Sequence, residues 1–303
     1  DNKKMKSIKE KLSGVFAPVV MPFKDDKLLL DDLRDNIRKL NETKLTGYLA
    51  HGSNGEFRSL NDEEQIKVLE VFAEEKGDKV VMVGTACEST TQTIDKTKQV
   101  ADMGFDFASI LTPCYFAKKM TDEVLIGYYT RIADNSPIPI LLYNAPGFAG
   151  GVSVSPTAAK VLAGHENIVG MKDSSSVGPN GFLAKLDGIE DFHVMAGSAN
   201  FFYPTLHIGT VGGIISLSNV LPEPCCDLYQ LFIDGKYDEA RTLHLKLQRL
   251  NGAVSGSHGV AGVKGAMDIA GFHGGEPRHP LIKITDADKQ KIRESIISEG
   301  FTL

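Results

Sequence analysis

The sequence has no long apolar segment. None of its apolar runs approaches the roughly 20 residues that a helix needs to span a bilayer. Residues 1–11 are polar and rich in lysine, and they lack the apolar core of a secretory signal. We therefore expect no membrane partner for this chain.

An excess of positive charge is also missing. The 303 residues include 33 lysines and arginines against 39 aspartates and glutamates, which gives a formal net charge of −6. This balance does not suggest a nucleic-acid-binding face. The hydrophobic content of 42% and the charged content of 24% are typical of a globular protein. The length allows one large domain or two ordinary ones.

Cysteine is scarce, and its spacing fits no common framework. The four residues are Cys87, Cys114, Cys225 and Cys226. They match neither a disulfide scaffold nor a zinc site, which predicts a protein of the reducing cytoplasm. The 8 histidines are scattered without the spacing of zinc ligands, so we expect no metal.

Two common catalytic motifs are absent as well. No Gly-x-Gly-x-x-Gly turn follows an early strand, which argues against an open dinucleotide-binding sheet. No Gly-x-Ser-x-Gly sequence follows a strand, which argues against a serine hydrolase.

What the sequence does contain is a regular alternation of strands and helices. Eight short apolar runs of strand type alternate with segments of helical pattern. The runs are 14–22, 47–50, 80–84, 107–112, 138–143, 168–171, 192–196 and 211–216. Eight such units in about 220 residues predict an α/β fold, a (β/α)8 TIM barrel over residues 12–220.

The remaining chain shows helical patterns only. We predict helices at 222–232, 237–250, 260–270 and 286–299. Residues 221–303 would then form a C-terminal helical region that packs on the barrel.

Lys172 directly follows the buried run Ile168–Met171. Desolvation disfavours the charged form of a lysine, and the free amine condenses with carbonyls to a Schiff base. The alternative is a structural lysine whose stem is buried and whose ammonium reaches a salt bridge. The run by itself favours this alternative.

The residues at the ends of the other predicted strands favour the catalytic interpretation of Lys172 over the structural one. Chemistry in a TIM barrel lies at the carboxyl ends of the strands. The loop His51–Phe57 is either a plain Asn-Gly turn or a glycine-rich turn that holds a carboxylate. Tyr143 ends the fifth run, where it is either an amphipathic cap or a proton donor. Because Lys172 directly follows the sixth run, amine and phenol together favour Schiff-base cleavage of a carbon–carbon bond.

The order of these motifs resembles the dihydrodipicolinate synthase / N-acetylneuraminate lyase superfamily of class I aldolases. The resemblance covers roughly residues 12–300. The matching motifs are Gly52–Glu56, Thr112–Tyr115, Tyr143–Pro146, Gly170–Ser174 and Ala196–Ser198. It implies a TIM barrel that needs no cofactor, and a homotetramer built as a dimer of dimers.

The resemblance also implies roles for single residues. Lys172 would form the Schiff base with pyruvate or another small keto acid, and Tyr143 would be the general acid and base. Ser53 would link this tyrosine to Tyr115, which in the family reaches into the site of a neighbouring subunit.

The remaining site residues are implied to bind substrate. Ser53 and Asn54 would hold the keto-acid carboxylate through their loop. Gly197 and Ser174 would line the same pocket.

The sequence departs from the lysine-pathway synthases at two places. Phe148 stands where those enzymes usually carry an arginine that binds the carboxylate of the semialdehyde. Glu88, Gln92 and Cys114 replace residues of their lysine-feedback pocket. The sequences of the motifs are most similar to those of 4-hydroxy-2-oxoglutarate aldolases, which release pyruvate and glyoxylate.

We therefore predict cleavage of 4-hydroxy-2-oxoglutarate. The first alternative is 4-hydroxy-tetrahydrodipicolinate synthase activity on pyruvate and aspartate semialdehyde. A sialic-acid or 2-keto-3-deoxy sugar-acid aldolase is the second. An alternative of a different class is a non-catalytic barrel that binds a keto acid.

Overall fold

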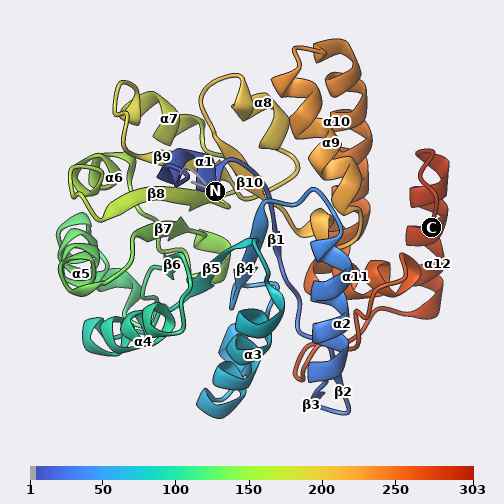
Figure 1. Cartoon of the computed structure of the whole chain (residues 1–303), viewed down its shortest axis with the longest axis horizontal. Coiled ribbons are helices and arrows are strands. Elements are labelled where there is room, and N and C mark those ends of the chain that lie inside the picture. Colours follow the sequence, from blue (N-terminus) through green and yellow to red (C-terminus); the bar gives the residue numbers. More distant parts are fainter. Residues whose placement is uncertain (1–4) are drawn as a thin grey trace. The chain divides into compact units, whose positions relative to one another are not determined.

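The computed structural model describes residues 5–303 and contains a closed barrel of eight parallel strands (Figure 1). Their order around the barrel is β1-β10-β9-β8-β7-β6-β5-β4. The strands are β1 (Gly14–Pro18), β4 (Gly47–Ala50), β5 (Val80–Gly84), β6 (Phe107–Leu111), β7 (Ile140–Asn144), β8 (Ile168–Asp173), β9 (His193–Ala196) and β10 (Gly212–Ile214). The predicted TIM barrel is confirmed, and each strand overlaps one of the predicted runs.

Helices connect the successive strands. Helix α1 (Ile8–Leu12) precedes β1, and the connecting helices are α2 (Leu30–Asn41), α3 (Asp62–Glu75), α4 (Thr90–Asp102), α5 (Asp122–Asn135), α6 (Pro156–Leu162), α7 (Asn180–Leu186) and α8 (Phe202–Leu206). In Figure 1, helices α4–α7 lie along the outside of strands β6–β9. A small antiparallel hairpin, β2 (Phe23–Lys24) and β3 (Lys27–Leu28), precedes α2.

The four predicted C-terminal helices are present. They are α9 (Pro222–Ile233), α10 (Tyr237–Asn251), α11 (Ser257–Ile269) and α12 (Asp286–Ser298). α11 begins three residues earlier than residue 260, because a π-helical turn at Gly252–Gly256 continues the coil from α10. None of the helices within residues 5–303 is long and apolar enough to cross a membrane.

The chain forms two compact units that differ from a simple division at residue 220. One unit joins the described N-terminal residues up to Gly14 with Val80–Ile214. The other joins Val15–Lys79 with Ile215–Leu303. The predicted boundary between barrel and C-terminal region stays a prediction.

Local capping explains where the helices begin. The Asn61 side chain accepts a hydrogen bond from the Glu64 N–H, and the Glu64 carboxylate accepts one from the Asn61 N–H, as in a capping box. Thr121 caps α5 through its hydroxyl, which accepts from the Val124 N–H at 3.3 Å. Such caps satisfy amide groups that the helix itself leaves unpaired.

The strands of the first unit are buried on both faces. Ile110 of β6, Ile140 of β7 and Met171 of β8 are each 0% exposed, and they share one buried cluster with Leu125 and Ile132 of α5. Parallel strands under helices are expected to read as continuous apolar runs. Each such side chain contributes roughly 1.5–3 kcal/mol by leaving water. This is why the runs predicted the strands so directly.

Candidate active site

Lys172 and Tyr143 lie side by side on neighbouring strands. In the ladder between β7 and β8, Tyr143 pairs with Lys172 and Asn144 pairs with Asp173. The ladder therefore continues two residues beyond Met171, where the sequence predicted the end of the strand. Lys172 lies within β8 rather than in the loop that follows, and the strand backbone fixes its direction.

The two side chains contact each other in a nearly dry environment. The Lys172 Nζ lies 4.5 Å from the centroid of the Tyr143 ring. Lys172 is 5% exposed and Tyr143 is 4% exposed. A buried amine beside a phenol provides a nucleophile and a proton-transfer group at one place. The structure thus brings together the two residues that the sequence analysis placed at the centre of the site.

The next residues on the two strands, Asn144 and Asp173, point to the opposite face and form hydrogen bonds that fix the two strand ends. Asn144 donates from Nδ2 to the Asp173 Oδ1 at 2.8 Å. Asp173 also accepts from the Ser175 hydroxyl at 2.8 Å. Asn144 accepts through Oδ1 from the Ser153 hydroxyl at 3.0 Å and from the Val154 N–H at 2.9 Å. Because side chains alternate along a strand, this network holds Tyr143 and Lys172 without occupying their face.

The hydrogen bonds of Asn144 and Asp173 were not predicted from the sequence. The signal was present, because a polar residue follows each of the two candidates directly in the sequence. Asp173 is 0% exposed, and a buried carboxylate needs several hydrogen-bond donors.

Ser174 and Gly197 also lie together, at the carboxyl ends of β8 and β9. The Gly197 N–H donates to the Asp173 carbonyl at 2.8 Å. A Cβ at position 197 would lie 2.0 Å from the Ser174 Oγ and 2.7 Å from the Asp173 carbonyl oxygen. Glycine is therefore required for this close approach of the two loops.

A cavity of about 660 Å³ opens beside the ends of β7 and β8. Its lining includes Asn144, Ser174 and the apolar Val177 and Phe182. Among the described residues that line it, none carries a charge.

Tyr115 differs from the buried pair because its side chain is 80% exposed. It packs edge-on against Phe116, with ring centroids 5.0 Å apart. The backbone beneath is fixed by Glu88, whose carboxylate accepts from the N–H groups of Cys114 and Tyr115 at 3.0–3.2 Å. The exposed ring is available to a neighbouring subunit, but its predicted role there stays a prediction.

Ser53 and Asn54 lie in a tight loop that follows β4. The Gly55 N–H donates to the Gly52 carbonyl at 3.1 Å, and the Glu56 N–H donates to the Ser53 carbonyl at 3.0 Å. A Cβ at Gly52 would lie 2.7 Å from the Leu49 Cδ2, so a larger residue there would require the Leu49 side chain to shift. Ser53 and Asn54 are half-buried. The loop belongs to the second unit, and the predicted carboxylate-holding role stays a prediction.

Metal ligands do not gather in the part of the chain that the structure describes. Within residues 5–303, no three histidine, cysteine, aspartate or glutamate side chains are grouped so that they could hold a metal ion.

Comparison with known proteins shows the family of the chain. Residues 11–299 match the model of the dihydrodipicolinate synthetase family. The 4-hydroxy-tetrahydrodipicolinate synthase of Methanothrix thermoacetophila is 32% identical over 93% of this chain and 95% of its own length. The synthase of the same name from Methanospirillum hungatei is 34% identical over 93% of this chain and 97% of its own length.

A solved structure shows the same architecture. The dihydrodipicolinate synthase of Thermotoga maritima superimposes with a TM-score of 0.88 at 27% identity, over 96% of this chain and 99% of that one. The chain therefore belongs to the dihydrodipicolinate synthetase family, and it is a carbon–carbon lyase.

Proposed function

We propose that this enzyme makes or breaks the carbon–carbon bond next to a pyruvate unit through a Schiff base on Lys172. The observation that carries the proposal is the contact between the buried Lys172 amine and the Tyr143 ring. A desolvated amine attacks a ketone readily, and the adjacent phenol can move the protons that each step requires.

In the cleavage direction, the Lys172 amine attacks the C2 ketone of the substrate and water leaves. The resulting protonated imine is the electron sink. Tyr143 takes the proton of the C4 hydroxyl while the C3–C4 bond breaks, and the bonding electrons move into the enamine. An aldehyde leaves, C3 of the enamine is protonated, and hydrolysis of the imine releases pyruvate and free Lys172.

The other residues are proposed to hold the substrate. Ser53 and Asn54 would bind the keto-acid carboxylate, because a tight turn can present backbone N–H groups to an anion. Ser174 and Gly197 would line the pocket beside Lys172. Ser53 would relay protons between Tyr143 and Tyr115, with Tyr115 supplied by a second subunit of a homotetramer. Its 80% exposure supports a place at an interface between copies.

Two partner aldehydes are candidates. The relatives are named 4-hydroxy-tetrahydrodipicolinate synthase, which favours condensation of pyruvate with aspartate semialdehyde over the predicted cleavage of 4-hydroxy-2-oxoglutarate. Phe148 favours the cleavage, because an exposed apolar ring stands where an arginine would bind the semialdehyde carboxylate.

Two assays decide between these reactions. In the first, the enzyme receives 4-hydroxy-2-oxoglutarate and pyruvate release is measured. In the second, it receives pyruvate with aspartate semialdehyde, and loss of both substrates is measured. Turnover in one assay assigns the partner. A lack of turnover in both, combined with retained pyruvate binding, would support the non-catalytic alternative.

Phe148→Arg tests the role of this position. Phe148 is 65% exposed, so an arginine is accommodated without repacking the core. A bidentate guanidinium is expected to raise kcat/KM for aspartate semialdehyde by about 10- to 100-fold. Phe148→Leu is the matched control, because it changes the ring but adds no charge. Equal effects of both substitutions would show that position 148 does not contact the carboxylate.

A further inference from the structure

The loop Gly52–Glu56 is flanked by unfavourable backbone geometry. His51 has φ 56° and Glu56 has φ 49°, so both occupy the left-handed region that side chains other than glycine rarely adopt. Such geometry persists only where surrounding contacts impose it. The contacts of Glu56 therefore bear on how Ser53 and Asn54, three and two residues before it, are presented.

Glu56 is held by two partners from the C-terminal region. Its carboxylate pairs with the Lys264 ammonium of α11. Its other oxygen accepts from the Arg278 N–H at 2.9 Å. Glu56 is 6% exposed and Lys264 is 1% exposed, so this ion pair is closed off from water.

Lys264 is itself surrounded by acceptors. Its Nζ donates to the Met21 carbonyl at 2.6 Å and to the Glu276 carbonyl at 3.0 Å, and it lies 4.8 Å from the centroid of the Phe23 ring. Burial lowers the pKa of Lys264, and the Glu56 carboxylate opposes this shift. The ammonium is thus bound at a fixed point rather than free to react.

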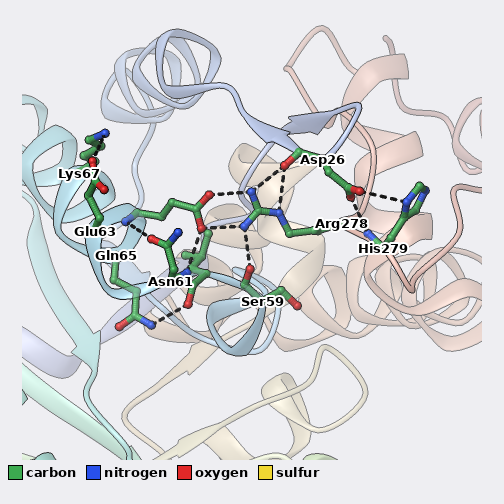
Figure 2. A network of polar contacts seen from close by, with 10 residues as sticks. Asp26, Ser59, Asn61, Glu63, Gln65, Lys67, Arg278 and His279 are labelled. Carbon is green, nitrogen blue, oxygen red and sulfur yellow. Dashed lines mark hydrogen bonds and ion pairs between the residues drawn. The ribbon is translucent and has the colours of Figure 1, made fainter.

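The Arg278 side chain fixes the segment that follows the loop. Its guanidinium donates to both oxygens of Glu64 at 2.7 Å and to the Ser59 carbonyl at 2.7 Å. Figure 2 shows Arg278 between Ser59 and Asp26, whose carbonyl accepts at 2.6 Å from the same guanidinium. The chain from Glu56 to Glu64 is therefore anchored at both ends.

We infer that the buried Glu56–Lys264 ion pair positions the Ser53–Asn54 loop for binding the carboxylate of the keto acid. This inference rests on the proposed function, since the ion pair would explain why the same site prefers a keto acid with a carboxylate. Apolar residues generally stabilise a core as well as a buried ion pair does, so stability alone does not account for the pair. Because the ion pair is attached to the strained end of the Ser53–Asn54 loop, it can hold that loop in one conformation.

The test compares pyruvate with acetone, which has the same ketone and no carboxylate. Each is incubated with enzyme and cyanoborohydride, and labelling of Lys172 is followed by peptide mass against ligand concentration. In Lys264→Met, the half-saturating pyruvate concentration is expected to rise by about 10- to 100-fold, while that of acetone changes by less than about threefold. The limiting rate of labelling stays near that of the wild type.

Two further variants make the result decisive. Lys67→Met removes an exposed ion pair with Glu63 in the same unit and is expected to leave both ketones unaffected. The double variant Lys264→Met/Glu56→Gln leaves no unpaired buried charge, so we expect it to fold even where the single variant does not. It is expected to lose the preference for pyruvate.

Several outcomes would overturn the inference. One is a folded variant in which the ratio of the half-saturating concentrations of pyruvate and acetone equals that of the wild type. Another is an equal rise in the half-saturating concentrations of both ketones. The third is an unfolded double variant, which would show that the pair serves stability. A wild-type enzyme that forms no pyruvate adduct on Lys172 would instead contradict the proposed function itself.

Discussion

Lys172→Met is expected to lower kcat by at least about 10⁴-fold, because it removes the nucleophile on which every covalent step depends. Methionine keeps an unbranched apolar stem beside Tyr143, so the fold should be retained. Lys264, the other lysine that is buried among the described residues, cannot substitute, since Glu56 and two carbonyl groups enclose its ammonium. Turnover at saturating substrate measures the effect.

Lys160→Met is the control for this substitution. Lys160 is an exposed lysine on α6, in the same unit as Lys172. Removal of its charge is expected to leave kcat unchanged. If Lys172→Met were folded and within about tenfold of wild-type kcat, the amine would not be the nucleophile.

Tyr143→Phe is expected to lower kcat by about 10²- to 10⁴-fold, the usual contribution of a positioned acid or base. The substitution removes the hydroxyl and keeps the ring against which the Lys172 amine lies. The Schiff base with pyruvate should therefore still form on Lys172, while cleavage of the carbon–carbon bond slows. Single-turnover kinetics separate the two steps.

Tyr129→Phe provides the matched control. The Tyr129 hydroxyl is fully buried and donates to the Ile110 carbonyl at 2.8 Å. Its removal should lower the free energy of unfolding by roughly 1 kcal/mol and leave kcat intact. Wild-type kcat in Tyr143→Phe would rule out the proton-transfer role.

The barrel could be predicted because its buried strands appear in the sequence as continuous apolar runs. Ile140 and Met171 sit in apolar runs whose two faces are both covered, and such runs stand out from the helical segments between them. The helix starts at Asn61 and Thr121 depend on local sequence, because each cap joins residues three apart in the chain. Lys172 and Tyr143 were found because strand ends concentrate chemistry in this fold.

The supporting contacts could not be predicted in the same way. Glu56 and Lys264 are 208 positions apart, and no local pattern joins them. Lys264 follows an ordinary helical pattern in α11 and reads as a surface lysine until its burial is known. The β2–β3 hairpin was missed because its strands have two residues each, and its turn places Asp25 and Asp26 at φ 49° and 61°.

The most direct test of the central claim is reduction of the enzyme with borohydride in the presence of pyruvate, followed by peptide mass mapping. We expect one reduced pyruvyl adduct, on Lys172, formed only when pyruvate is present. The absence of an adduct, or an adduct on a different lysine, would contradict the Schiff-base mechanism and return Lys172 to a structural role.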